Sequence, residues 1–259
     1  MTEFLTAPGD PALLSAALLF FVGMAAGAIN VMAGSGSALT LPALIFSGLD
    51  GSEANGTNRL AILIQNIAAG ASFSRERAAG GFRESVKYSL FTLPGMVCGV
   101  LVAVSIDDLL FKKIAGGVIL LVAASMFLPS LVSGEGGGRF ARRKWLLYPA
   151  LVATGFYGGF IQVGVGLVIM GLMFHLVGGG MAEVNARKVF IVLIYTAPAF
   201  VMFFFSGNVD LLKGFNLAAG SAIGGWWGAK LSVRKGAAAV RWFLVVALLL
   251  SGLKLFGVL

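Results

Sequence analysis

Long apolar stretches recur along this chain with only short polar intervals between them. A helix needs about 20 apolar residues to span the hydrocarbon core of a bilayer, which is about 30 Å thick. Most of the stretches reach that length, but two are short, and a helix of about 13 residues extends only about 20 Å. We mark ten stretches, at residues 11–33, 37–49, 60–74, 86–105, 109–131, 145–161, 163–177, 189–205, 211–230 and 239–257.

This pattern predicts an all-α polytopic membrane protein. Either eight helices cross fully and the short elements 37–49 and 163–177 are broken or re-entrant, or all ten cross. The composition agrees, because only 12% of the residues are charged and the mean hydropathy is +0.94. Soluble domains carry about 25% charged residues. A chain so poor in charge needs lipid rather than water around it.

The charged residues and the single cysteine exclude several classes of function. The net charge is +8, but the basic residues lie in short loops between apolar stretches, so membrane topology explains them and we expect no nucleic-acid partner. Cys98 lies within an apolar stretch and has no second cysteine with which to form a disulfide or a zinc site. We expect no metal and no cofactor. The chain has neither a zinc-protease motif nor a Walker phosphate loop, so we expect no enzyme.

Two glycine-rich breaks interrupt the apolar stretches. One is Gly34-Ser35-Gly36-Ser37, and the other runs from Gln162 to Gly166. Glycine lets a neighbouring backbone or a ligand approach closely. Irregular backbone at membrane depth is tolerated only inside protein or beside a wet cavity. The alternative explanation is close packing of helices on small residues.

The two breaks belong to a wider repeat with an offset of 130 residues. At this offset Gly34 matches Gly164, Gly36 matches Gly166, Gly48 matches Gly178, Gly95 matches Gly225, Leu63-Ile64 matches Leu193-Ile194, and Glu53-Ala54-Asn55 matches Glu183-Val184-Asn185. The chain therefore divides into a first repeat of five segments at 1–131, a linker loop at 132–144 and a second repeat at 145–259. Internal repeats of this kind are typical of secondary transporters.

The basic residues predict how the repeats are oriented. Fourteen of the 19 Lys and Arg lie in the loops 74–87, 132–144, 178–188 and 230–241. By the positive-inside rule these loops, including the linker, are cytoplasmic, and both chain ends lie outside the cytoplasm. Five segments in each repeat then make the two halves inverted, as expected for alternating access across a cell membrane.

Polar residues gather where the third and eighth apolar stretches begin. A helix start there offers free backbone N–H groups and the positive end of the helix dipole, and an added arginine grips two oxygens of an oxyanion at once. Polar side chains beside the two breaks either ligate the substrate directly or bridge helices. The candidate substrate-binding residues are Asn55, Thr57, Asn58, Arg59, Asn185, Arg187, Ser35, Ser37, Asn30 and Gln162.

Ordinary structural roles compete with substrate binding at these positions. Asn55 is also a good N-cap, and Arg59, Arg187 and Lys188 have the length to snorkel to the interface, which we favour for Lys188. Glu53 and Glu183 match between the repeats. They are candidates for proton coupling, or else first-turn residues that satisfy the helix dipole.

Several of these stretches resemble the sulfite exporter TauE/SafE family. The first signature of that family is similar to Gly27–Asn30, Ala33–Ser37, Leu39–Pro42 and Ala54–Leu60, and the second is similar to Gly158–Gly166 with Val184–Lys188. The second repeat carries Arg187-Lys188 where the first has Thr57-Asn58, so the two half-sites differ chemically.

The resemblance implies a secondary transporter, usually an exporter, of small sulfur-containing anions such as sulfite, thiosulfate or organosulfonates. Its expected partners are the anionic substrate, a coupling proton and the lipid bilayer, and a homo-oligomer is compatible with the pattern. An anion channel and a non-transporting membrane scaffold or assembly protein are the alternative functions. Matched polar breaks at membrane depth argue against the scaffold.

Overall fold

The computed structural model of this chain describes residues 11–75, 82–125, 141–234, 249 and 251–255, and these residues contain helices and no strand. The helices are α1 (Pro11–Ala33), α2 (Ser37–Phe46), α3 (Gly51–Arg75), α4 (Phe82–Ser105), α5 (Asp108–Ser125), α6 (Leu147–Phe160), α7 (Val165–Leu172), α8 (Met181–Phe205) and α9 (Leu211–Arg234). A 3-10 turn over Ala141–Leu146 precedes α6, and a π-helical turn over Met173–Val177 follows α7. The linker up to residue 140 and most of the predicted stretch at 239–257 lie outside the described residues.

The helices confirm an all-α membrane protein. Within the described residues, α1 over Leu13–Ala33, α4 and α8 are long and apolar enough to cross a bilayer. The helices at Ser37–Phe46 and Val165–Val177 are apolar but shorter, as predicted for the second and seventh stretches. Many large apolar side chains point outward, Phe205 at 82% exposure among them. Lipid is the solvent that suits such a surface.

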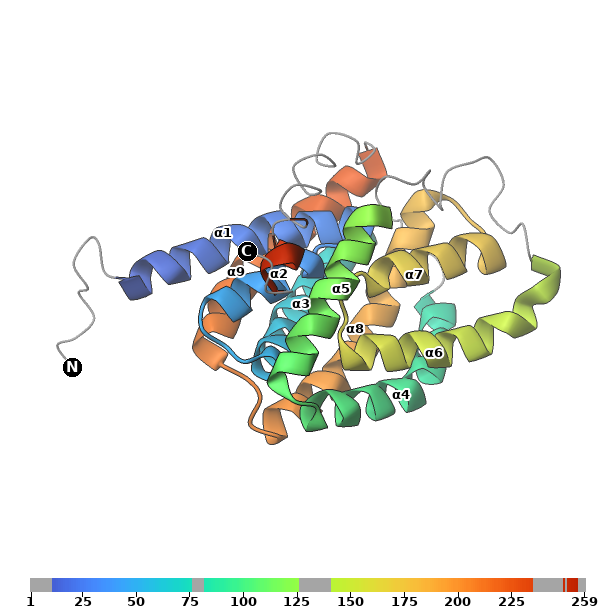
Figure 1. The fold of residues 1–259 in the computed structure, drawn as a ribbon. Helices are drawn as coiled ribbons and strands as arrows, with labels where there is room; N and C mark the ends of the chain where they lie inside the picture. Colours follow the sequence, from blue (N-terminus) through green and yellow to red (C-terminus); the bar gives the residue numbers. More distant parts are fainter. Residues whose placement is uncertain (1–10, 76–81, 126–140, 235–248, 250, 256–259) are drawn as a thin grey trace.

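Helices of the first half pack mainly against helices of the second. α1 lies along α9, α4 lies along α6, and α3 crosses α8 near the centre of the fold (Figure 1). The 130-residue offset maps α3 onto α8 residue for residue, because Gly51–Arg75 and Met181–Phe205 have the same length. The same offset maps α1 onto α6 and α4 onto α9, so the packed pair α1–α9 corresponds to the packed pair α6–α4. This matching supports the two predicted repeats, whereas their inversion across the membrane stays a prediction.

Small residues bring these crossed pairs together. Gly220, Gly224 and Gly228 lie one turn apart on α9, and a Cβ at Gly224 would lie 1.9 Å from the carbonyl oxygen of Met24 on α1. Gly155 on α6 packs equally closely on the backbone of α4. Glycines at such a spacing let helix backbones touch, which is how helices associate in lipid. Close packing therefore explains the glycines in these helices.

Candidate transport site

The two breaks differ from the packing glycines because their backbone leaves the helical conformation. Gly34 has φ 78° and its match Gly164 has φ 71°, while Gly48 and its match Gly178 have φ 97° and 86°. Residues with a Cβ rarely adopt such values. The repeat identified in the sequence is therefore also present in the backbone at these four positions. At the centre of the fold the breaks touch, with the backbone of Gly34 packed directly on that of Gly166.

Side chains also join the two breaks. The Ser37 hydroxyl donates to the Gln162 carbonyl at 3.1 Å and accepts from the Gly164 N–H at 3.4 Å. Ser37 begins α2, so one hydroxyl links the N-terminus of one short helix to the break before the other. The Gln162 backbone has φ 55°, the one positive value for a non-glycine residue in the described chain. Such a conformation costs about 1–2 kcal/mol and needs its surroundings to hold it.

The end of α1 and the second break are each tied to the long helix of their own repeat. The Asn30 amide donates to Gln65 Oε1 on α3 at 3.4 Å. The Gln162 amide donates to Thr196 Oγ1 at 3.0 Å and to the Tyr195 hydroxyl at 3.5 Å, both on α8. Gln65 and Tyr195 are 130 residues apart. The acceptors are therefore matched between the repeats, whereas the donors Asn30 and Gln162 are not.

Arg59 holds the broken end of α6. Its Nη1 donates to the carbonyl of Gly158 at 3.0 Å and its Nη2 to that of Gly159 at 2.5 Å. One turn earlier on α3, the Asn55 amide donates to the Phe160 carbonyl at 2.8 Å. The last carbonyls of a helix have no partner within the helix, and a cation there also favours the negative end of the dipole. Asn55 and Arg59 thus satisfy three groups that neither water nor lipid would reach.

Lys188 holds the broken end of α1 in the corresponding way. Its ammonium donates to the carbonyls of Asn30 at 3.0 Å and Val31 at 2.6 Å, and to Asn185 Oδ1 at 3.2 Å. The helix α3 therefore caps α6 with an amide and a cation four residues apart, whereas α8 caps α1 with the Lys188 ammonium alone. The interpretation that Lys188 snorkels to the interface is wrong, because the side chain is 2% exposed and ends inside the protein.

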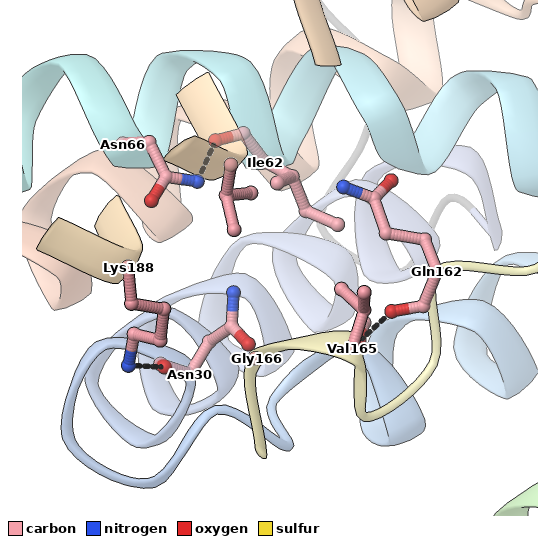
Figure 2. A pocket seen from close by; sticks show the side chains of 9 residues that line it. Asn30, Ile62, Asn66, Gln162, Val165, Gly166 and Lys188 are labelled. Carbon is pink, nitrogen blue, oxygen red and sulfur yellow. Dashed lines mark hydrogen bonds between the residues drawn. The ribbon is translucent and has the colours of Figure 1, made fainter. Parts of the chain in front are cut away.

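A small cavity lies beside Lys188, between the two breaks and the two central helices (Figure 2). Its volume is about 10 Å³, which is room for about one water molecule. One cation, polar side chains and an apolar wall share its lining. The lining residues are Asn30, Ser37, Ile62, Asn66, Gln162, Val165, Gly166, Lys188 and Val192. The site in this conformation is too small for an oxyanion.

The structure brings some predicted site residues to this centre and places others elsewhere. Asn30, Ser37 and Gln162 line the cavity. The predicted Thr57 lies on another side of α3, where its hydroxyl accepts from the Asp210 N–H at 2.9 Å. Asn58 Oδ1 accepts from the Thr40 hydroxyl at 2.7 Å, which joins α2 to α3. Their predicted contacts with substrate stay predictions, as does that of the fully buried Ser35.

The remaining predicted residues of the second repeat form an ion-pair cluster. Arg187 donates to the Gly178 carbonyl at 2.7 Å and pairs with Glu183 at 2.6 Å and with Glu84 at 3.5 Å. These contacts fix the start of α8 against the turn before it and against α4. Asn185 also donates to Ser232 on α9 at 2.6 Å. The proton-coupling roles of Glu183 and of the half-buried Glu53 stay predictions.

One local expectation is wrong. Asn55 to Arg59 and Asn185 to Lys188 do not lie at helix N-termini, because α3 begins at Gly51 and α8 at Met181. Their backbone N–H groups lie beyond the first turn, where the helix uses them internally. An anion at this level therefore meets side chains rather than free helix N–H groups.

Sequence reasoning favoured an interfacial role for Lys188, which lines the cavity in the structure. A usable signal was present, namely an amide followed three or four residues later by a cation, at Asn55 and Arg59 and again at Asn185 and Lys188. Residues so spaced share one helix face. Such a face on each of the two central helices predicts polar contacts between that helix and a neighbouring helix.

Comparison with known proteins agrees with the architecture. The sequence model of the family described as sulfite exporter TauE/SafE matches residues 19–255. A "Probable membrane transporter protein" of Haemophilus influenzae is 31% identical over 233 residues, which cover 89% of this chain and 90% of that protein. The "Probable membrane transporter protein ORF9" of a Sinorhizobium species is 27% identical over 93% of this chain and 92% of its own length. The "Probable membrane transporter protein YfcA" of Escherichia coli K12 is 28% identical over 92% of this chain and 88% of its own. No solved structure matches the chain.

Proposed function

Because this chain belongs to the sulfite exporter TauE/SafE family and is a membrane transporter, we propose that it exports a small sulfur-containing anion. The substrate class is sulfite, thiosulfate or a short organosulfonate, and the route is outward across the cell membrane. Transport proceeds by alternating access, with the cavity beside Lys188 as the substrate site.

The single observation that carries this proposal is the ammonium of Lys188. It is buried at the meeting point of the two halves and lines the cavity, and its partners among the described residues are neutral oxygens and the Met170 sulfur. A buried charge without a counter-ion is costly, so the site favours an anion as its missing partner. Intramembrane ionisable residues of this kind commonly mark a substrate path.

Neutral polar groups around the ammonium supply directional contacts. Asn30, Ser37 and Asn66 line the same cavity and carry N–H or O–H donors suited to anionic oxygens. In this conformation those donors bind protein acceptors, for example the Ser37 hydroxyl on the Gln162 carbonyl. Separation of the breaks during transport would release the Ser37 hydroxyl to the substrate. A centre too small to hold an anion, between two halves, supports alternating access over an open channel.

Flux into proteoliposomes tests the proposal. Purified protein is assayed with labelled sulfite, thiosulfate and methanesulfonate, and the variant Lys188→Gln is compared with Lys87→Gln, whose lysine is exposed on α4. Saturable flux that is lost in Lys188→Gln and kept in Lys87→Gln is the expected result. Equal flux in the two variants would place the site elsewhere, and flux that never saturates would favour a channel.

A further inference from the structure

We propose that the site selects singly charged anions with one uncharged substituent, so that hydrogensulfite and organosulfonates are carried in preference to sulfate and thiosulfate. This inference rests on the proposed function and narrows its substrate class. It follows from the number of charges that the structure places at the cavity and from the apolar residues in the cavity wall.

One charged side chain reaches the cavity among the described residues that line it. Lys188 supplies a single positive charge, and the other polar lining groups are two asparagines, one glutamine and one serine, which are neutral. Burial of the Lys188 side chain, which is 2% exposed, limits the water and counter-ions that would compensate further charge. One ammonium balances a monoanion, whereas a dianion leaves one negative charge buried and unpaired, which is costly.

The other buried cations nearby are committed to protein groups. Both terminal nitrogens of Arg59 bind carbonyls at the end of α6, and its guanidinium lies 4.6 Å from the ring centre of Phe203. Arg187 is paired with Glu183 and Glu84. Neither arginine lines the cavity. A second positive charge could reach the substrate only if one of these arrangements broke.

The cavity wall also disfavours a second anionic substituent. Ile62, Val165 and Val192 give it an apolar side, which suits a methyl or methylene group (Figure 2). Gln162 lines the same space, and a neutral amide can accept a hydrogen bond from a hydroxyl group. The apolar side and the neutral amide therefore fit one neutral substituent on a singly charged anion.

Competition between matched anions tests this selectivity. Methanesulfonate and sulfate are both tetrahedral and differ by a methyl group in place of one charged oxygen, so each is titrated against labelled sulfite influx into wild-type proteoliposomes. Thiosulfate is the second dianion and ethanesulfonate the second monoanion. We expect the half-maximal inhibitory concentrations of the monoanions to be at least about tenfold lower than those of the dianions.

An added charge provides the complementary test. Asn66→Lys places a second cation at the cavity, and Asn66→Gln is the uncharged control of similar size. We expect Asn66→Lys to move the preference toward sulfate and thiosulfate, whereas Asn66→Gln keeps the wild-type order. Equal or stronger inhibition of the wild type by sulfate would overturn the selectivity and leave the transport of sulfur anions intact. Absence of flux with every anion would instead refute the proposed function.

Discussion

The backbones of Gly34 and Gly166 meet where the two breaks cross, and a Cβ on Gly34 would lie 2.5 Å from the carbonyl carbon of Gly166. The contact is reciprocal, since a Cβ on Gly166 would lie 2.6 Å from the Gly34 Cα. Backbone cannot move aside as the end of a flexible side chain can. The two repeats therefore touch at the centre through residues that have no side chain.

This contact predicts that Gly166→Ala is destabilising whereas Gly171→Ala is not. Both glycines lie on α7, but a Cβ at Gly171 meets no atom within 4 Å. Alanine at an open helical position is favoured over glycine by about 0.5–1 kcal/mol. At Gly166 the added methyl forces the breaks apart, at a cost of about 1–3 kcal/mol for overpacking. Thermal melting in detergent, followed by tryptophan fluorescence, separates the two variants. Equal melting temperatures would show that the breaks do not pack as described.

Loss of the Arg59 guanidinium is expected to weaken folding more than substrate affinity. Arg59→Gln leaves carbonyls at the end of α6 without their charged donor, which costs about 2–4 kcal/mol in total. Arg59→Lys keeps the charge but loses the bidentate hydrogen bonding of the guanidinium, so its melting temperature should lie between those of the wild type and Arg59→Gln. The exposed Arg83 gives the control variant Arg83→Gln. For folded Arg59→Gln in proteoliposomes we expect KM close to the wild-type value. A large rise in KM with unchanged thermal stability would favour direct binding of substrate by Arg59.

The sequence predicts most helix ends to within a few residues but misplaces the starts of α3 and α8. The predicted stretch 86–105 is α4 at Phe82–Ser105, and 211–230 is α9 at Leu211–Arg234. The stretch 60–74 belongs to a helix that begins at Gly51. Its first turns carry Asn55 and Arg59, whose polar side chains look like a loop when their partners are not known. Those partners are carbonyls about 100 residues away, and a hydropathy pattern contains no information on such contacts.

The same reasoning explains which parts of the site were predictable. Glycine spacing and the 130-residue offset identify the breaks, because they depend on local backbone conformation. They do not distinguish Lys188, which lines the cavity, from Arg187, which is held by two carboxylates. Adjacent residues on a helix point about 100° apart, and only the packed structure shows which direction faces the centre.

The positive φ at Gln162 predicts an unusual order of stability among its variants. Gln162→Ala keeps the strained backbone and loses the amide bonds to α8, whereas Gln162→Gly loses the same bonds but relieves the strain. Glycine loses more chain entropy on folding than alanine, which offsets part of the relieved strain. The glycine variant should therefore be more stable than the alanine variant by about 1 kcal/mol. Gln162→Asn tolerates this backbone conformation and should lie near the glycine variant. Denaturation of the three variants in detergent measures the order, and an alanine variant at least as stable as glycine would contradict it.

The two ends of α8 allow a direct test of the predicted orientation. Gly180 precedes the helix and Ser206 follows it, both are exposed, and a Cβ at Gly180 meets no atom within 4 Å. The one natural cysteine, Cys98, is first replaced in Cys98→Ser so that labelling reports a single site. Because the basic loop 178–188 is predicted to be cytoplasmic, Ser206→Cys should react with a membrane-impermeant maleimide in intact cells, and Gly180→Cys only after the cells are opened. The reverse pattern would put both chain ends inside the cytoplasm. Labelling of both positions in intact cells would show that α8 does not cross the membrane.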